Sequence, residues 1–212
     1  MIDLYYAHFS QPFETVKYQA YLQLLPQEMQ HKVGRYMRWQ DAHSSLIGKL
    51  LLIEGLKKYG YDHTRLQDIR YSKYDRPYLD DLEFNISHSG QYVLCALSNN
   101  AKIGVDVEEV RPIDFNDFDR QFTKAEWDVI HSFADPLHGF YNMWTKKEAI
   151  VKADGKGLNI PLEDIIVNDL IAQVYGVEWY LKPIPIDGKY LVHLAANVKI
   201  DSQLKVQFVD LH

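Results

Sequence analysis

Apolar residues recur along the chain in two patterns, one with helical spacing and one with strand-like alternation. The clearest helical pattern lies at residues 42–59, where leucines and isoleucines form a wide apolar stripe. Asp41 precedes this stripe as a candidate N-cap, and Gly60 follows it as a candidate C-cap. The sequence therefore predicts a long helix that packs one face against a core.

Further helical spacing is found in three segments, which are residues 26–39, 123–132 and 138–153. The second of them begins with Thr123 and carries Glu126 three positions later, which is the pattern of a capping box. The third is followed by Gly155, a residue suited to the end of a helix. We therefore expect helices at all three places.

Strand-like patterns are found at residues 2–9, 84–87, 91–98 and 103–109. The Asn99-Asn100 pair between the last two predicts a turn and hence a hairpin. The tail, residues 163–210, contains four short apolar runs typical of strands. Helices followed by strands, twice over, favour an α+β fold over an alternating β/α fold, with a boundary near residues 104–114.

Charge and composition narrow the classes of function. The 212 residues carry a net charge of −6, which argues against a broad nucleic-acid-binding surface. Apolar runs such as Leu50–Ile53 are far shorter than a membrane helix requires, and the first residues lack the pattern of a secretory signal. Cys95 is the only cysteine, so an intramolecular disulfide and a cysteine-based zinc site are excluded. We expect a soluble, cytoplasmic protein.

Two carboxylates occur close together in the sequence IGVDVEE. Asp106 and Glu108 are two positions apart on a predicted strand, so their side chains point to the same face. Each negative charge raises the pKa of the other carboxyl unless a cation lies between them. Mg²⁺ prefers such hard oxygen ligands. The alternative is an exposed strand end that is acidic without any function.

A third carboxylate lies in the predicted helix at residues 138–153. Trp144, Glu148 and Lys152 are spaced by four residues, so they share one face of that helix. Glu148 is a candidate third metal ligand, and Lys152 is placed to neutralise a phosphate. The alternative is an ordinary surface pair of glutamate and lysine, which stabilises a helix only slightly.

Several polar residues in the first half are suited to binding a phosphate. Ser87 and His88 follow an apolar run in FNISHSG, but adjacent side chains on a strand point in opposite directions, which excludes a catalytic dyad. Lys32 belongs to a basic cluster before the long helix, and Arg76 precedes a proline that holds the chain extended. The alternatives are a structural turn and solvated surface charge.

Taken together, these motifs and their order resemble the 4′-phosphopantetheinyl transferase superfamily. The resemblance rests on FNISHSG, IGVDVE and WTKKEAIVK, together with the upstream stretch KVGRYMRWQDAHSSLIGKLLL and the turn YDRPYL. It covers residues 26–162, and the length is similar to that of the larger, monomeric type that activates surfactin synthetase. This type implies two similar α+β halves related by a pseudo-twofold axis, residues 1–104 and 105–212. Each half would carry a small antiparallel sheet against helices, with the ligand in the cleft between them.

The resemblance also implies an activity and its cofactor. Such enzymes transfer the 4′-phosphopantetheine group of coenzyme A to a serine of an apo-acyl or apo-peptidyl carrier protein and release adenosine 3′,5′-bisphosphate. Asp106, Glu108 and Glu148 would hold Mg²⁺ against the pyrophosphate. Glu148, or a water that it orients, would take the proton of the serine, and Lys152 would balance charge on the phosphate. No covalent enzyme intermediate is needed, which fits the absence of an activated nucleophile pattern.

The same resemblance assigns the nucleotide end of coenzyme A to the first half. Ser87, His88, Lys32 and Arg76 would face the 3′-phosphate and nearby atoms. Met29 stands where relatives often carry another lysine, and an arginine at position 76 replaces a common lysine. These two departures leave the expected chemistry unchanged.

Residues 111–127 are a candidate docking surface for the carrier protein. The segment mixes phenylalanines with basic residues, namely Phe115, Phe118, Phe122, Arg111, Arg120 and Lys124. The alternative is that the three phenylalanines pack in the core of the second half. Two other functions also remain open at the level of sequence, which are a Mg²⁺-dependent phosphohydrolase and a non-catalytic coenzyme A-binding module.

Overall fold

The computed structural model describes residues 1–200 and 204–211, and the chain divides into two compact units. Unit 1 contains Met1–Asn100 together with Gln203–His212, and unit 2 contains Ala101–Ser202. Both units mix helices with small sheets, so the predicted α+β class is confirmed. The pseudo-twofold relation and the halves 1–104 and 105–212 stay predictions. The C-terminal strand is grouped with unit 1, because it pairs with the first strand of the chain.

The helices of unit 1 are α1 (Thr15–Leu22), α2 (Gln27–Gly34), α3 (Trp39–Lys57) and the 3₁₀ helix η1 (His63–Asp68). Its strands are β1 (Ile2–His8), β2 (Arg70–Tyr71), β3 (Pro77–Tyr78), β4 (Glu83–Ser89), β5 (Tyr92–Ser98) and β11 (Lys205–Phe208). The main sheet has the order β11-β1-β5-β4, and β2 and β3 form a separate pair. The β1–β5 and β5–β4 pairs are antiparallel, as expected, and β11 adds to the edge of this sheet parallel to β1.

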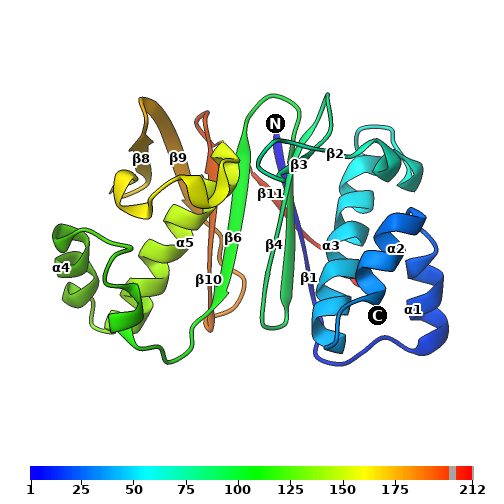
Figure 1. Ribbon diagram of the computed structural model, residues 1–212, viewed down its shortest axis with the longest axis horizontal. Helices are drawn as coiled ribbons and strands as arrows, with labels where there is room; N and C mark the ends of the chain where they lie inside the picture. The colour runs from blue at the N-terminus through cyan, green and yellow to red at the C-terminus, as the bar shows by residue number, and fades with distance from the viewer. Residues whose placement is uncertain (201–203, 212) are drawn as a thin grey trace. The chain divides into compact units, whose positions relative to one another are not determined.

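Helix α3 packs against the main sheet of unit 1 with its leucine-rich face (Figure 1). The helix was predicted, but the assignment of Asp41 as its N-cap is wrong. The cap position is occupied by Arg38, and Asp41 lies in the first turn, where its negative charge favours the helix N-terminus. Gly60 adopts a left-handed φ of 81° two residues beyond the C-cap. The helix predicted at residues 26–39 is shorter, because α2 ends at Gly34.

The helices of unit 2 are α4 (Lys124–Ser132), α5 (Pro136–Asp154) and the 3₁₀ helices η2 (Phe115–Phe118), η3 (Gly157–Asn159) and η4 (Leu162–Asp164). Its strands are β6 (Ile103–Glu109), β7 (Ile166–Asn168), β8 (Ile171–Val174), β9 (Val177–Pro183) and β10 (Tyr190–Ala196). They form one antiparallel sheet with the order β6-β10-β9-β8-β7. The helix α5 packs across β6 and β10 (Figure 1).

The predicted hairpin of residues 91–98 with residues 103–109 is wrong. Both edges of β5 are already paired, one with β1 and the other with β4, so no edge is left for β6. β6 instead pairs with β10 in the sheet of unit 2. The turn residues at positions 99 and 100 therefore connect two sheets rather than two strands of one sheet.

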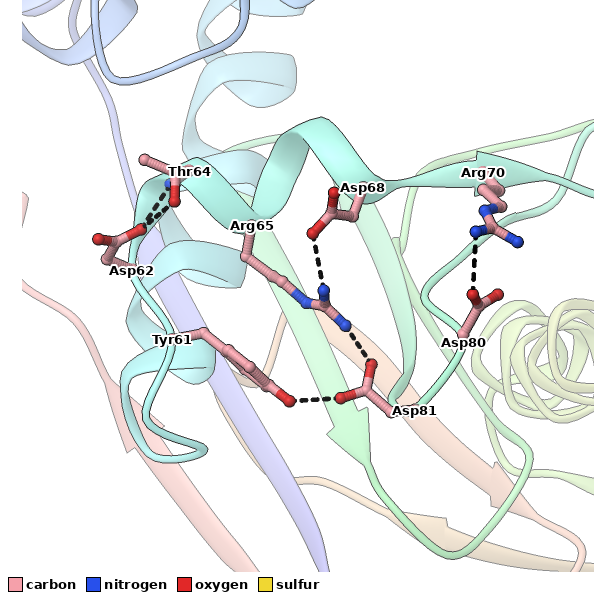
Figure 2. Close-up of polar contacts among 8 residues, drawn as sticks. All are labelled: Tyr61, Asp62, Thr64, Arg65, Asp68, Arg70, Asp80 and Asp81. Carbon is pink, nitrogen blue, oxygen red and sulfur yellow. Dashed lines mark hydrogen bonds and ion pairs between the residues drawn. The ribbon is translucent and has the colours of Figure 1, made fainter.

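The segment between α3 and β4 has little regular structure and is held by polar contacts (Figure 2). Arg65 donates to Asp68 over 2.7 Å and also pairs with Asp81, which accepts a further hydrogen bond from Tyr61. These contacts fix the course of the chain that leads into the β2–β3 pair. Within residues 1–200 and 204–211, no helix is long and apolar enough to cross a membrane.

Candidate active site

A glycine in β6 brings α5 unusually close to the strand. A Cβ atom added at Gly104 would lie 2.1 Å from the Ala149 carbonyl oxygen and 2.4 Å from the Ala153 nitrogen. Such distances are far below van der Waals contact, so only glycine permits this approach. Asp106 and Glu108 follow at intervals of two residues, so they share the strand face that Gly104 turns toward α5.

Helix α5 supplies the other two predicted residues to the same place. The Lys152 ammonium lies 2.6 Å from Oδ1 of Asp106, whose side chain is almost completely buried. Glu148 precedes Lys152 by one helical turn and is half-buried. The predicted face of α5 therefore does meet the predicted face of β6, and both belong to unit 2.

Burial and nearby charges raise the pKa of Glu148. Burial is the largest cause that raises the pKa of Glu148, and the negative charge of Asp106 is the next. Glu108 adds a smaller effect in the same direction, whereas the Lys152 ammonium lowers the Glu148 pKa. Three carboxylates supply the hard oxygen donors that Mg²⁺ prefers. This donor set fits the ion that the family resemblance implies.

The carboxylates are nevertheless not arranged as a preformed metal site. Across the parts of the chain that the structure describes, no three His, Cys, Asp or Glu side chains form a group that could hold a metal ion. Lys152 is the cation beside Asp106 in this arrangement. The three-ligand site of Asp106, Glu108 and Glu148 therefore stays a prediction.

A buried histidine lies beside Asp106 on the neighbouring strand. His193 lies directly opposite Asp106 in the β10–β6 ladder, so both side chains point to the face covered by α5. Nδ1 of His193 is 2.8 Å from the hydroxyl oxygen of Thr145. Burial lowers the pKa of His193 to about 3, with a further contribution from Lys146, so the imidazole is neutral at physiological pH.

The four nucleotide-binding candidates all belong to unit 1. The Lys32 ammonium lies 5.0 Å from the centre of the Tyr71 ring. Arg76 donates to Glu83 over 2.6 Å. Ser87 is buried and His88 is exposed, as expected for adjacent residues on a strand.

Met29 and the phenylalanines of residues 111–127 contribute to the cores. Met29 packs against the core of unit 1. Phe122 is buried in unit 2, while Phe115 and Phe118 are half-buried against Phe140, with ring centres 5.6 and 4.9 Å from it. These contacts favour the core alternative over a surface of exposed apolar anchors for a carrier protein.

Three features of this site were not predicted from the sequence. Gly104 was not singled out, although a glycine inside a strand indicates the close approach of another backbone. His193 had no recognisable motif, because its role depends on strand register. The capping box at Glu126 was predicted, but its contact with Lys147, at 2.6 Å, was not.

Comparisons with known proteins agree with the motifs. A sequence model of the 4′-phosphopantetheinyl transferase superfamily matches residues 102–207, and a model of a 4′-phosphopantetheinyl transferase N-terminal domain matches residues 11–100. The 4′-phosphopantetheinyl transferase Sfp of Bacillus subtilis is 33% identical over 174 residues, covering 78% of this chain and 76% of Sfp. The transferase gsp of Aneurinibacillus migulanus is 34% identical over 66% of this chain and 60% of its own.

The chain is also similar to a mammalian enzyme and to one solved structure. The L-aminoadipate-semialdehyde dehydrogenase-phosphopantetheinyl transferase of Mus musculus is 30% identical over 80% of this chain and 66% of its own. The crystal structure of Thermotoga maritima holo-[acyl-carrier-protein] synthase aligns with 45% of this chain and 61% of its own, with 18% identity and a TM-score of 0.35. That structural similarity is too low to support an argument.

The sequence matches select among the three functions that the motifs left open. They favour a transferase over a phosphohydrolase and over a non-catalytic coenzyme A-binding module, because all the curated relatives named above are phosphopantetheinyl transferases. The family resemblance that the motifs indicated is confirmed over most of the chain. The chain belongs to the 4′-phosphopantetheinyl transferase superfamily and is an enzyme that transfers phosphopantetheine to carrier proteins.

Proposed function

We propose that this enzyme requires Mg²⁺ held by Asp106, Glu108 and Glu148, and that it releases adenosine 3′,5′-bisphosphate from coenzyme A. The observation that carries the proposal is the electrostatic coupling of Glu148 to Asp106 and Glu108 on one face of unit 2. Carboxylates that raise one another's pKa are stabilised by a bound cation. When bound, Mg²⁺ would neutralise charge on the pyrophosphate of coenzyme A.

The protein side chains supply proton transfer and charge balance. Glu148 accepts the proton of the carrier serine, directly or through an oriented water, because its raised pKa makes the carboxylate a stronger base than an exposed one. Lys152 moves from Asp106 to the phosphate that leaves, since an ammonium on a flexible stem reaches either partner. This division of roles needs no covalent intermediate on the protein.

The 3′-phosphate and nearby atoms of coenzyme A are bound by four residues of unit 1, namely Lys32, Arg76, Ser87 and His88. Support comes from their chemistry: an ammonium, a guanidinium, a hydroxyl and an imidazole are all donors to a phosphate. Arg76 is already charged and paired with Glu83, so binding exchanges one anionic partner for another. We further propose that the enzyme is a cytoplasmic monomer and that an acyl or peptidyl carrier protein is its acceptor.

Titration of coenzyme A with and without Mg²⁺ tests the metal requirement. We expect Mg²⁺ to tighten binding to the wild type and to have little effect on Asp106→Ala. Replacing Lys32 by alanine should weaken binding to a similar degree with and without the ion. In transfer assays, Glu148→Gln should lower turnover at least about 10²-fold, as expected for the loss of a general base. Equal coenzyme A affinity in Mg²⁺ and in chelator would contradict the proposal.

A further inference from the structure

Lys147 is a completely buried lysine immediately before Glu148. Its ammonium lies 2.6 Å from one carboxylate oxygen of Glu126 and 2.7 Å from the other. It also donates to the Leu162 carbonyl oxygen over 2.8 Å and lies 5.2 Å from the centre of the Phe122 ring. One side chain of α5 thus contacts three other segments of unit 2.

Glu126 makes hydrogen bonds besides its contact with Lys147. The same carboxylate accepts hydrogen bonds from the Thr123 backbone nitrogen, at 2.9 Å, and from the Thr123 hydroxyl, at 3.1 Å. The Glu126 nitrogen in turn donates to that hydroxyl over 3.3 Å, which completes the capping box of α4. The ion pair therefore ties α5 to the first turn of α4, a place whose own geometry is fixed by capping.

Helix α5 contacts Gly104 of β6 on one side and the partners of Lys147 on another side. Successive residues of a helix are rotated by about 100°, so Lys147, Glu148 and Ala149 point in three directions. The α5 backbone at Ala149 and Ala153 lies against Gly104 of β6, and the Lys147 side chain is held by α4 and the segment at Leu162. A helix fixed on two sides cannot rotate about its axis, so the direction of Glu148 between them is determined.

We propose that the buried pair of Lys147 and Glu126 positions Glu148 for phosphopantetheine transfer by fixing the rotation of α5. This inference rests on the role proposed for Glu148. Lys147 and Glu126 are positioning residues, since they act through Glu148 and the backbone of α5. A misplacement of about 1 Å at a reacting group is sufficient to lower a rate about 10²-fold.

A purely stabilising role makes a different prediction, because a buried ion pair is a poor way to stabilise a core. Replacing both partners by apolar residues of similar volume is often neutral or stabilising, whereas removing one partner leaves a buried charge alone. Directional contacts of charged groups can instead specify one arrangement among several. Stability and positioning can therefore be separated by changing both residues together.

The test compares the paired variant Glu126→Leu/Lys147→Met with the wild type in urea unfolding and in carrier-modification kinetics. We expect a folded variant whose urea midpoint falls by no more than the lost cap at Thr123 explains, a kcat about 10²-fold lower and an unchanged KM for the carrier protein. A wild-type kcat in the folded paired variant would overturn the inference. The exposed pair of Glu54 and Lys57 on α3, also 2.6 Å apart, provides the control Glu54→Gln/Lys57→Met, which should keep the wild-type kcat.

A second variant covers the case in which the paired variant does not fold. Glu126→Gln keeps an oxygen acceptor for Thr123 and Lys147 but removes the negative charge. We expect its folded molecules to lose at least about 10-fold in kcat without a change in KM, in line with a partial misplacement of the base. A kcat per folded molecule equal to that of the wild type would overturn the positioning role.

Glu148→Gln separates this inference from the proposed function. If Lys147 and Glu126 act through Glu148, adding the paired change to Glu148→Gln should alter the residual rate less than about 2-fold, since coupled changes are not additive. A 10²-fold further loss would overturn the inference alone. A wild-type rate in Glu148→Gln by itself would overturn the proposed role of Glu148 and, with it, the premise of the positioning role.

Discussion

The Lys152 ammonium lies 2.6 Å from the Asp106 carboxylate, on a face where Glu108 and Glu148 add further negative charge. A lysine of the protein is thus the cation beside the most buried of the three carboxylates. A divalent ion bound by these carboxylates would take over that function and release Lys152 for the phosphate. The exchange explains how one lysine serves both the free enzyme and the proposed reaction.

Replacing Lys152 by methionine should make folding stability depend more strongly on Mg²⁺. Without the ammonium, the repulsion between Asp106 and Glu148 is less well balanced, so a bound cation stabilises the variant more than the wild type. Melting temperatures with and without Mg²⁺ measure this difference. The matched control is Lys156→Met, which removes an ammonium paired with Asp154 nearby. Equal Mg²⁺-induced shifts in Lys152→Met and in the wild type would contradict the exchange.

The raised pKa of Glu148 should make its contribution to folding stability fall as pH rises. Because the folded chain binds this proton more tightly than the unfolded chain, the stability that it contributes is fully present below the unfolded pKa of about 4.3. It is lost as pH rises through the raised folded pKa. Glu148→Gln removes this titration. The unfolding free energy of the variant, relative to that of the wild type, should therefore increase as pH rises. Urea unfolding over pH 4–8 without Mg²⁺ measures the difference, and one that is independent of pH would refute the expectation.

Gly104→Ala should damage both folding and turnover. The added methyl group would overlap the α5 backbone at Ala149 and Ala153, and a backbone cannot move aside as a side chain can. We expect a loss of roughly 3 kcal/mol in unfolding free energy, near the upper end for overpacking, and a large fall in kcat. Gly188→Ala in the same unit meets nothing within 4 Å and should change neither quantity. Wild-type stability in Gly104→Ala would show that α5 does not need this close approach.

Phe118→Ala should act through stability rather than through carrier recognition. The ring packs 4.9 Å from that of Phe140 and 5.4 Å from that of Trp144, centre to centre. Truncating a half-buried ring of this kind should cost roughly 2 kcal/mol. Folded molecules should keep the wild-type KM for the carrier protein. A raised carrier KM at unchanged stability would restore the docking role for this segment.

The elements that were predicted correctly carry their own local signals. Thr123 and Glu126 form the expected capping box, and α5 ends before Gly155, which adopts a φ of 85° that favours glycine. Helix α1 was missed, because none of its residues is fully buried and no apolar stripe marks it. Local pattern thus predicts an element when that element caps itself or buries a continuous face.

The local sequence pattern does not predict which distant segments pair with one another. The turn at Asn99-Asn100 favours a hairpin, but β5 is enclosed by β1 and β4, which no feature of residues 91–109 reveals. In the candidate site, the alternation of β6 correctly placed Asp106 and Glu108 on one face. The contact of Asp106 with Lys152 spans 46 residues and depends on how closely α5 approaches the sheet.

The proposed reaction requires one divalent ion bound by Asp106, Glu108 and Glu148. Mass spectrometry tests this requirement, with apo-acyl and apo-peptidyl carrier proteins incubated with coenzyme A and the enzyme. We predict the gain of one phosphopantetheine mass with the wild type in Mg²⁺, and no gain in chelator or with Asp106→Ala. The same gain in chelator, or with Asp106→Ala at the wild-type rate, would contradict the claim.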